Sequence, residues 1–156
     1  MKKSILSIIF LFVGLNIFAQ QIAFPGAEGF GAYSKGGRGG QVVEVTNLLD
    51  DENGEIEGSL RWAFKKCLPE PSTIVFRVSG IIHLVADLKG QFKKGLTLAG
   101  QTAPGDGICI RGHKVNFGGS SNLIIRDLRF RIGLNDDGSF VSGGSIGIEN
   151  ANNVYN

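Results

Sequence analysis

The sequence predicts an all-β fold in which short strands are wound into stacked coils, and two observations support this prediction. Residues 95–110, GLTLAGQTAPGDGICI, read as a short strand, a polar turn with Gly and Pro, and a second short strand. The start of such a strand recurs as GLTL, NLII and NVYN, at Gly95, Asn122 and Asn153, spaced 27 and 31 residues apart. One strand pair of this size cannot bury its own apolar face, so the repeats must cover one another. These features together predict a parallel β-helix.

The first residues predict a signal peptide. Residues 1–19 combine Lys2 and Lys3 with a short apolar stretch and the small Ala19, after which we expect cleavage. The apolar stretch is too short for a membrane anchor, so a secreted, periplasmic or cell-surface protein is expected. Two of the 16 Lys and Arg lie in this leader, which leaves 14 basic and 14 acidic residues. That balance gives no reason to expect nucleic acid or a membrane as partner.

Three elements are predicted between the leader and the coils. Residues 20–72 form this N-terminal region, in which glycines crowd 24–40 and indicate a loop packed over the end of the scaffold. Residues 41–48 alternate as a strand does, and Ser59 can cap a short amphipathic helix that closes the open end of the stack. Residues 73–156 then supply the first coils, as the strands TIVFRV, IIHLV, LTLAG, ICIRG, KVNFG, LIIRDLRFRI and SIGIEN.

Several common functional sites are excluded by their spacing. An EF-hand loop with Gly54 at its sixth position would have Leu49 and Leu60 as its first and twelfth residues, where oxygen ligands are needed. The acidic run from Asp50 is therefore read as a solvated turn. His83 and His113 lie far apart in the sequence without a metal-spaced partner, and we read them as surface or strand histidines.

The two cysteines, Cys67 and Cys109, carry no metal-binding spacing. Export would allow a disulfide between them, but nothing in the sequence brings them together, so free thiols are expected.

Two groups remain as candidate site residues. Asp136 and Asp137 leave the coils in one loop and could hold calcium through their carboxylates, or form a hydrophilic loop tip. Arg129 and Arg131 alternate along a strand, so they share a face that could bind an acidic polysaccharide. Pairing of these arginines with Asp127 or with neighbouring coils is the alternative.

The chain also resembles a known family. Five segments carry the resemblance, in the family's order: AFPGAEGFGAYSKGGRGG (23–40), VTNLLDDENGEIEGSLRWAF (45–64), STIVFRVSGII (72–82), residues 95–110, and LIIRDLRFR (123–131). They resemble the N-terminal part of secreted pectate lyases, which are polysaccharide lyases. The resemblance implies a right-handed parallel β-helix that is monomeric at full length, with a loop and helix cap.

The resemblance also implies a chemistry. Pectate lyases cleave polygalacturonate by β-elimination, with calcium bridging the protein and the uronate carboxylate and an arginine removing the C5 proton. That arginine and most calcium ligands match positions beyond Asn156, so no catalytic residue is transferred to this chain. The simplest register places Gly144 where many relatives have a calcium-binding aspartate. This segment is therefore expected to be inactive alone.

Two choices stay open at this point. The polymer could be pectate, methylated pectin or another uronate polysaccharide. A β-helix without catalytic activity, which binds glycan or serves as a surface scaffold, is the alternative to a lyase, because this fold hosts several functions.

Overall fold

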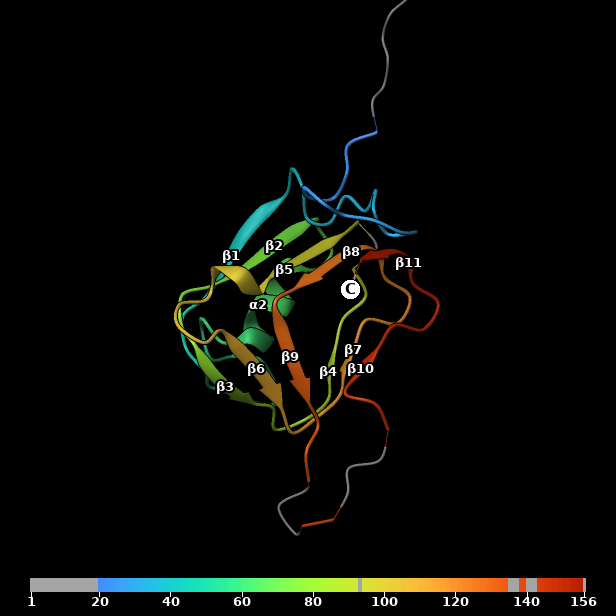
Figure 1. The fold of residues 1–156 in the computed structure, drawn as a ribbon. Coiled ribbons are helices and arrows are strands. Elements are labelled where there is room, and N and C mark those ends of the chain that lie inside the picture. Colours follow the sequence, from blue (N-terminus) through green and yellow to red (C-terminus); the bar gives the residue numbers. More distant parts are fainter. Residues whose placement is uncertain (1–19, 93, 135–137, 140–142, 156) are drawn as a thin grey trace, which may run out of the picture.

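The computed structural model describes residues 20–155 except 93, 135–137 and 140–142. Its strands form three parallel sheets around one core (Figure 1). The first sheet has the order β1 (Gln41–Val45), β2 (Ser72–Phe76), β5 (Leu96–Ala99), β8 (Ser121–Arg126) and β11 (Asn152–Tyr155). The second contains β3 (Gly80–His83), β6 (Ile108–Arg111) and β9 (Leu128–Arg131). The third contains β4 (Leu88–Lys89), β7 (Val115–Asn116) and β10 (Ile146–Gly147).

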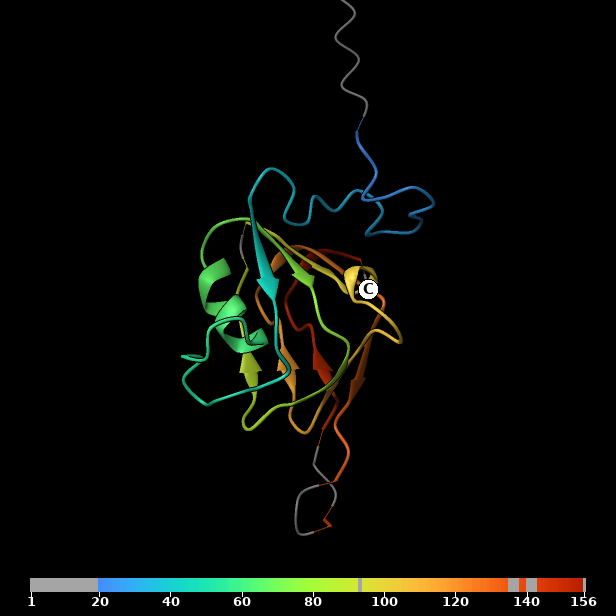
Figure 2. The same ribbon diagram turned by 90° about the vertical axis from the view of Figure 1, so that its left-hand side faces the viewer.

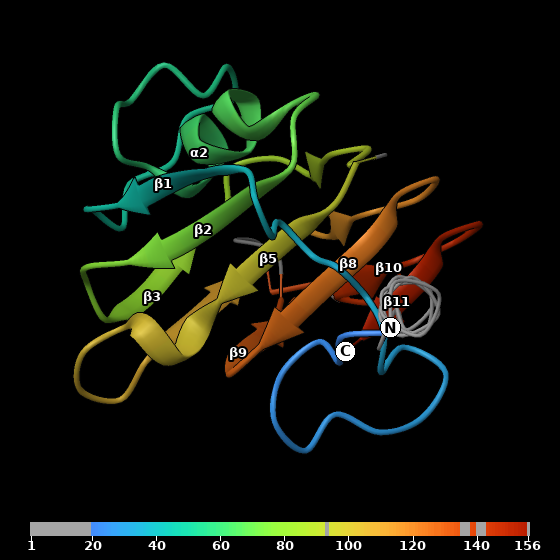
Figure 3. The ribbon, with the colours of Figure 1, turned by 90° about the horizontal axis from the view of Figure 1, so that it is seen from above.

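The chain visits the three sheets in turn, and each passage is one coil. It runs through β2, β3 and β4, then β5, β6 and β7, then β8, β9 and β10, before β11 returns to the first sheet. Figure 3 shows β1, β2, β5 and β8 side by side. All strand pairs among the described residues are parallel, in agreement with the predicted all-β fold of stacked strands. Gly95 and Asn122, which begin two of the repeated segments, have positive φ angles of 119° and 54°, so the chain turns at these positions.

Apolar side chains point inward at alternate strand positions and form the core. Eight such side chains alternate along β5, β6, β8 and β9, and six of the eight are at most 4 % exposed: Leu96, Leu98, Ile108, Ile110, Leu123 and Ile125. The other two, Leu128 and Phe130, are partly buried and pack against the same cluster. Alternation places every second side chain inside, and the next coil covers it.

The helix α2 (Leu60–Cys67) lies at the β1 end of the stack (Figure 2). The predicted cap is confirmed: the Ser59 hydroxyl accepts a hydrogen bond of 3.2 Å from the Trp62 amide. Phe64 of α2 meets Phe92 and Phe117 with ring centroids 5.2 and 5.8 Å apart. The helix therefore buries the first coils through an aromatic cluster. A short 3₁₀ turn, η1 (Gly100–Thr102), follows β5.

The acidic turn before α2 is not fully solvated, which corrects our expectation for Asp50. Its carboxylate is completely buried and accepts bonds from Arg61 Nε at 2.9 Å and Arg61 Nη2 at 2.8 Å. It also accepts the Val85 amide at 3.0 Å. Asp51 accepts the Glu55 amide, and this bond lowers the pKa of the Asp51 carboxyl. The run Asp50-Asp51 thus holds α2 and its preceding loop to the first coil.

The glycine-rich segment 20–40 is a loop, as predicted, but it does not cover the end of the stack. It crosses the outer side of the first sheet over strands from successive coils (Figures 1 and 3). The Ser34 hydroxyl donates to the Leu123 carbonyl and the Gly37 amide to Thr97 Oγ1, both at 3.0 Å. A Cβ at Gly37 would lie 1.8 Å from the Ser72 carbonyl oxygen, so only glycine permits this approach.

Candidate functional site

The two arginines predicted to bind substrate lie on β9 with exposed side chains. Parallel pairing places Arg131 beside Arg111 of β6, and Arg111 beside His83 of β3. Neighbouring strands are about 4.8 Å apart. Three basic side chains, one from each coil, therefore form a row on the outer face of this sheet, which we call the basic row: His83, Arg111 and Arg131.

Arg129 lies next to this row but is held by a structural contact. Its Nη2 donates to the Asp106 carbonyl at 2.7 Å, so it helps fix the loop before β6. The alternative pairing with Asp127 is not made by Arg129 or Arg131; Arg126 approaches Asp127 instead, at 3.8 Å. Within the described residues, no carboxylate forms an ion pair with Arg111, Arg129 or Arg131.

A depression of about 390 Å³ opens at one end of the basic row. Its lining residues are His83, Leu84, Val85, Arg111, Gly112, His113 and Leu134. His83 and His113 therefore share one hollow although they are distant in the sequence. His113 Nδ1 lies 3.6 Å from Asp87 Oδ1, so a carboxylate accompanies this histidine at the rim. The hollow offers one permanent cation and two imidazoles to an anionic ligand.

The predicted calcium ligands Asp136 and Asp137 lie outside the described residues. Among the residues that the structure describes, no three His, Cys, Asp or Glu side chains gather as a metal site. The same part of the chain contains no helix that is long and apolar enough to cross a membrane.

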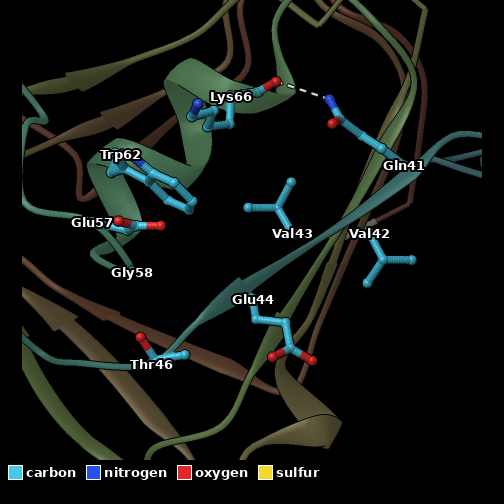
Figure 4. A pocket seen from close by; sticks show the side chains of 9 residues that line it. All are labelled: Gln41, Val42, Val43, Glu44, Thr46, Glu57, Gly58, Trp62 and Lys66. Atoms are coloured by element: carbon cyan, nitrogen blue, oxygen red, sulfur yellow. Dashed lines mark hydrogen bonds between the residues drawn. The ribbon is translucent and has the colours of Figure 1, made fainter.

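A second groove, of about 470 Å³, lies between β1 and α2 (Figure 4). Trp62 and Lys66 of α2 face Val43 of β1 across it, and Gln41 Nε2 donates to the Lys66 carbonyl at 2.8 Å. Carboxylates from β1 and from the loop before α2 line this groove, and Lys66 is its one lysine. This mixed charge suits a polyanion less well than the basic row does.

The two cysteines are free thiols, as expected. Cys67 is buried in α2, and this burial raises the pKa of its thiol to about 11. Cys109 is half-buried on β6, in register with Arg129.

Sequence reasoning missed Arg111 and the two histidines as members of the site. A signal was present: β3, β6 and β9 read GIIH, ICIR and LRFR, and each ends in a basic residue after a core residue. The pairing register of the three strands must be known before these last residues can be placed side by side in a row.

The chain is similar to three fungal proteins named probable pectate lyase C. It is 45 % identical to that of Emericella nidulans over 116 residues, covering 74 % of this chain and 25 % of the relative. It is 39 % identical to that of Aspergillus fumigatus over 127 residues, and 42 % to that of Aspergillus flavus over 120 residues. These matches cover 79 % and 76 % of this chain, and 28 % and 26 % of the relatives.

No protein-family model matches the chain. The chain spans about a quarter of the length of the curated relatives that it matches. Identity at this level over three quarters of the chain nevertheless settles the relationship that the five sequence segments indicated. The chain belongs to the pectate lyase family and corresponds to a segment of its members.

Proposed function

We propose that this chain is part of an exported lyase that cleaves pectate with the help of calcium. The observation that carries the proposal is the 39–45 % identity to proteins named pectate lyase. Residues 1–19 act as the signal peptide, 20–72 as the N-terminal cap region, and 73–156 as the first coils of a right-handed parallel β-helix. The full-length protein works outside the cytoplasm as a monomer.

The substrate is an acidic polysaccharide, and the basic row supplies its contacts in this segment. Arg111 and Arg131 are exposed and present planar guanidinium donors that match carboxylates. Their spacing follows the strand separation, so successive carboxylates of one polymer chain could meet successive coils. Arg129 is proposed to assist from the neighbouring position, within the limit set by its bond to Asp106.

The proposed reaction is a β-elimination. A base removes the C5 proton, and the electron pair of the broken C5–H bond forms a C4–C5 double bond. The glycosidic oxygen leaves C4 with the electron pair of the C4–O bond. Calcium, when bound, lowers the pKa of that proton by withdrawing charge from the carboxylate. Asp136 and Asp137 stay proposed calcium ligands, and the described residues supply no further set. The arginines of this segment bind and orient the polymer.

The experiment compares binding with cleavage. The mature chain should bind polygalacturonate in affinity electrophoresis but release no unsaturated product, measured by ultraviolet absorbance with added calcium. Arg111→Gln and Arg131→Gln should each weaken binding about threefold, since exposed ion pairs contribute little individually. Arg77→Gln is the matched control, because Arg77 is exposed and pairs with Glu44 away from the row.

Three results would contradict the proposal. Equal binding by the wild type and both row variants would remove the basic row from substrate recognition. Calcium-dependent cleavage by this chain, abolished by Asp136→Ala, would show that a complete active site lies within these residues. A longer gene product that binds the polymer without cleaving it would favour the non-catalytic glycan-binding alternative.

A further inference from the structure

A small hollow lies between the loop 20–40 and the outer face of the first sheet, away from the basic row. Its volume is about 180 Å³, below the usual 300–1,000 Å³ of sites for drug-sized molecules. It is lined by Ala23, Phe24, Lys35, Arg38, Thr73, Thr97, Gln101, Ile124 and Arg126. A space of this size suits one sugar ring or a smaller group.

Positive charge distinguishes this hollow from the groove beside α2. Lys35, Arg38 and Arg126 contribute three cations, and no carboxylate lines the hollow. Asp127 approaches Arg126 to 3.8 Å, but its side chain is half exposed and Asp127 is not among the residues that line the hollow. Three like charges held together repel one another, and an anion between them relieves that repulsion.

Two of the three cations, Arg126 and Arg38, are held in place before any ligand binds. Arg126 stacks on Phe24, with its guanidinium carbon 3.9 Å from the ring centroid. Arg38 Nη2 donates to the carbonyls of Ile22 and Ala23, both at 3.0 Å, which leaves the other guanidinium nitrogens for a ligand. The positions of these side chains are therefore largely set by contacts with the loop.

The loop itself is fastened over the strands beside the hollow. The Lys35 amide donates to Asn122 Oδ1 at 3.4 Å and the Gly37 amide to Thr97 Oγ1 at 3.0 Å. A Cβ at Gly36 would lie 2.2 Å from Thr97 Oγ1, so the loop is seated directly on the sheet. Thr73 and Thr97 are paired in register, and their side chains and Gln101 line the hollow as neutral polar groups.

We propose that this hollow binds the carboxylate and hydroxyl groups of a single uronate residue. The cations recognise the carboxylate, and Thr73, Thr97 and Gln101 contact sugar hydroxyls. The choice of a uronate rests on the proposed function, whereas the recognition of an oxyanion rests on the lining alone. The site is separate from the basic row, because it lies on a different sheet.

The test titrates the mature chain with D-galacturonate, followed by calorimetry or by NMR shifts of residues in the loop. D-galactose, which lacks the carboxylate, is the neutral ligand, and inorganic phosphate is the second anion. Lys35→Gln and Arg126→Gln should weaken galacturonate binding about tenfold, the effect of losing about 1.4 kcal/mol. Lys89→Gln, which removes an exposed charge on β4, should leave it unchanged.

The expected result is that galacturonate binds more tightly than galactose or phosphate and that both pocket variants weaken it. Lys35→Gln guards against a folding artefact, because the side chain is exposed and the backbone supplies the loop contact. Galacturonate affinity unchanged in both variants would overturn the site, and tighter binding of phosphate would overturn the uronate assignment. Failure of the proposed function would appear in a separate measurement, because Arg111→Gln and Arg131→Gln would then bind the polymer as tightly as the wild type does.

Discussion

Replacing Asp50 by Ala should destabilise this protein more than any change to its surface charges. The Asp50 carboxylate is fully buried, and its partner Arg61 has a side chain only 8 % exposed. Arg61 also donates to the carbonyls of Ala86 and Asp87, at 2.7 and 3.0 Å, so it cannot leave without breaking those bonds. The substitution would leave the buried Arg61 guanidinium without its carboxylate and the Val85 amide without its hydrogen-bond acceptor.

The expected loss is about 3–5 kcal/mol of the free energy of unfolding, the usual effect of removing one partner from a buried ion pair. The control is Glu44→Ala, which breaks the ion pair with Arg77. The Glu44 and Arg77 side chains are 47 % and 59 % exposed. That change should cost about 0.2–1 kcal/mol. The two losses therefore differ severalfold although each variant removes one carboxylate.

The assay is urea unfolding at neutral pH, followed by circular dichroism and by hydrogen exchange of the α2 amides. Exchange in α2 should accelerate in Asp50→Ala more than exchange in β8, since the ion pair joins the helix to the first coil. A loss below 1 kcal/mol, or a loss equal to that of Glu44→Ala, would refute the argument that this pair secures the helix.

Three further predictions follow from burial and from the leader. Leu98→Asp places a charge at a fully buried core position and should prevent soluble expression. Leu98→Met, the control, should be recovered in soluble form. A melting temperature of Leu98→Asp equal to that of the wild type would contradict the stacked core. Folding raises the pKa of the Cys67 thiol from 9.0 to about 11. The protonated thiol therefore contributes fully to the free energy of unfolding below pH 9, and about 3 kcal/mol of that free energy is lost as the pH rises to 11. Between pH 9 and pH 11, Cys67→Ala should lose less free energy of unfolding than the wild type does, as measured by urea titration. Identical pH profiles for the two proteins would contradict this prediction. Mass spectrometry of protein from the native host should find a terminus at Gln20 or Gln21, and an intact Met1 would contradict export.

The coil architecture could be predicted because each coil repeats a local pattern. Alternating apolar residues such as Leu96 and Leu98 indicate which side of a strand is buried, and Gly95 or Asn122 indicates where the chain turns. Both signals depend on neighbouring residues alone. The Ser59 cap was predictable for the same reason, since its partner Trp62 is three residues away.

The errors concern contacts made across the fold. Asp50 was read as solvated because its neighbours in the sequence are polar, but Arg61 and Val85, 11 and 35 residues away, bury it. The glycine-rich loop was correctly identified as irregular, yet two of its glycines, Gly36 and Gly37, are required by Thr97 and Ser72 of the strands that the loop crosses. Composition indicates a loop and cannot state which surface the loop covers.

The basic row depends on strand register, which brings basic residues from separate strands together on one face of the second sheet. Arg131 was predicted from alternation within one strand, but one exposed arginine has little affinity for a polysaccharide. Stacking adds Arg111 and His83 at the spacing between strands, so nitrogen-bearing side chains recur along the stack as carboxylates recur along a uronate polymer. The proposed recognition of a repeating polyanion depends on the same stacking that closes the core, since burial of Ile82 and Ile110 places His83 and Arg111 outside. Each coil that buries one more apolar residue in this sheet therefore also offers one more outward position for binding.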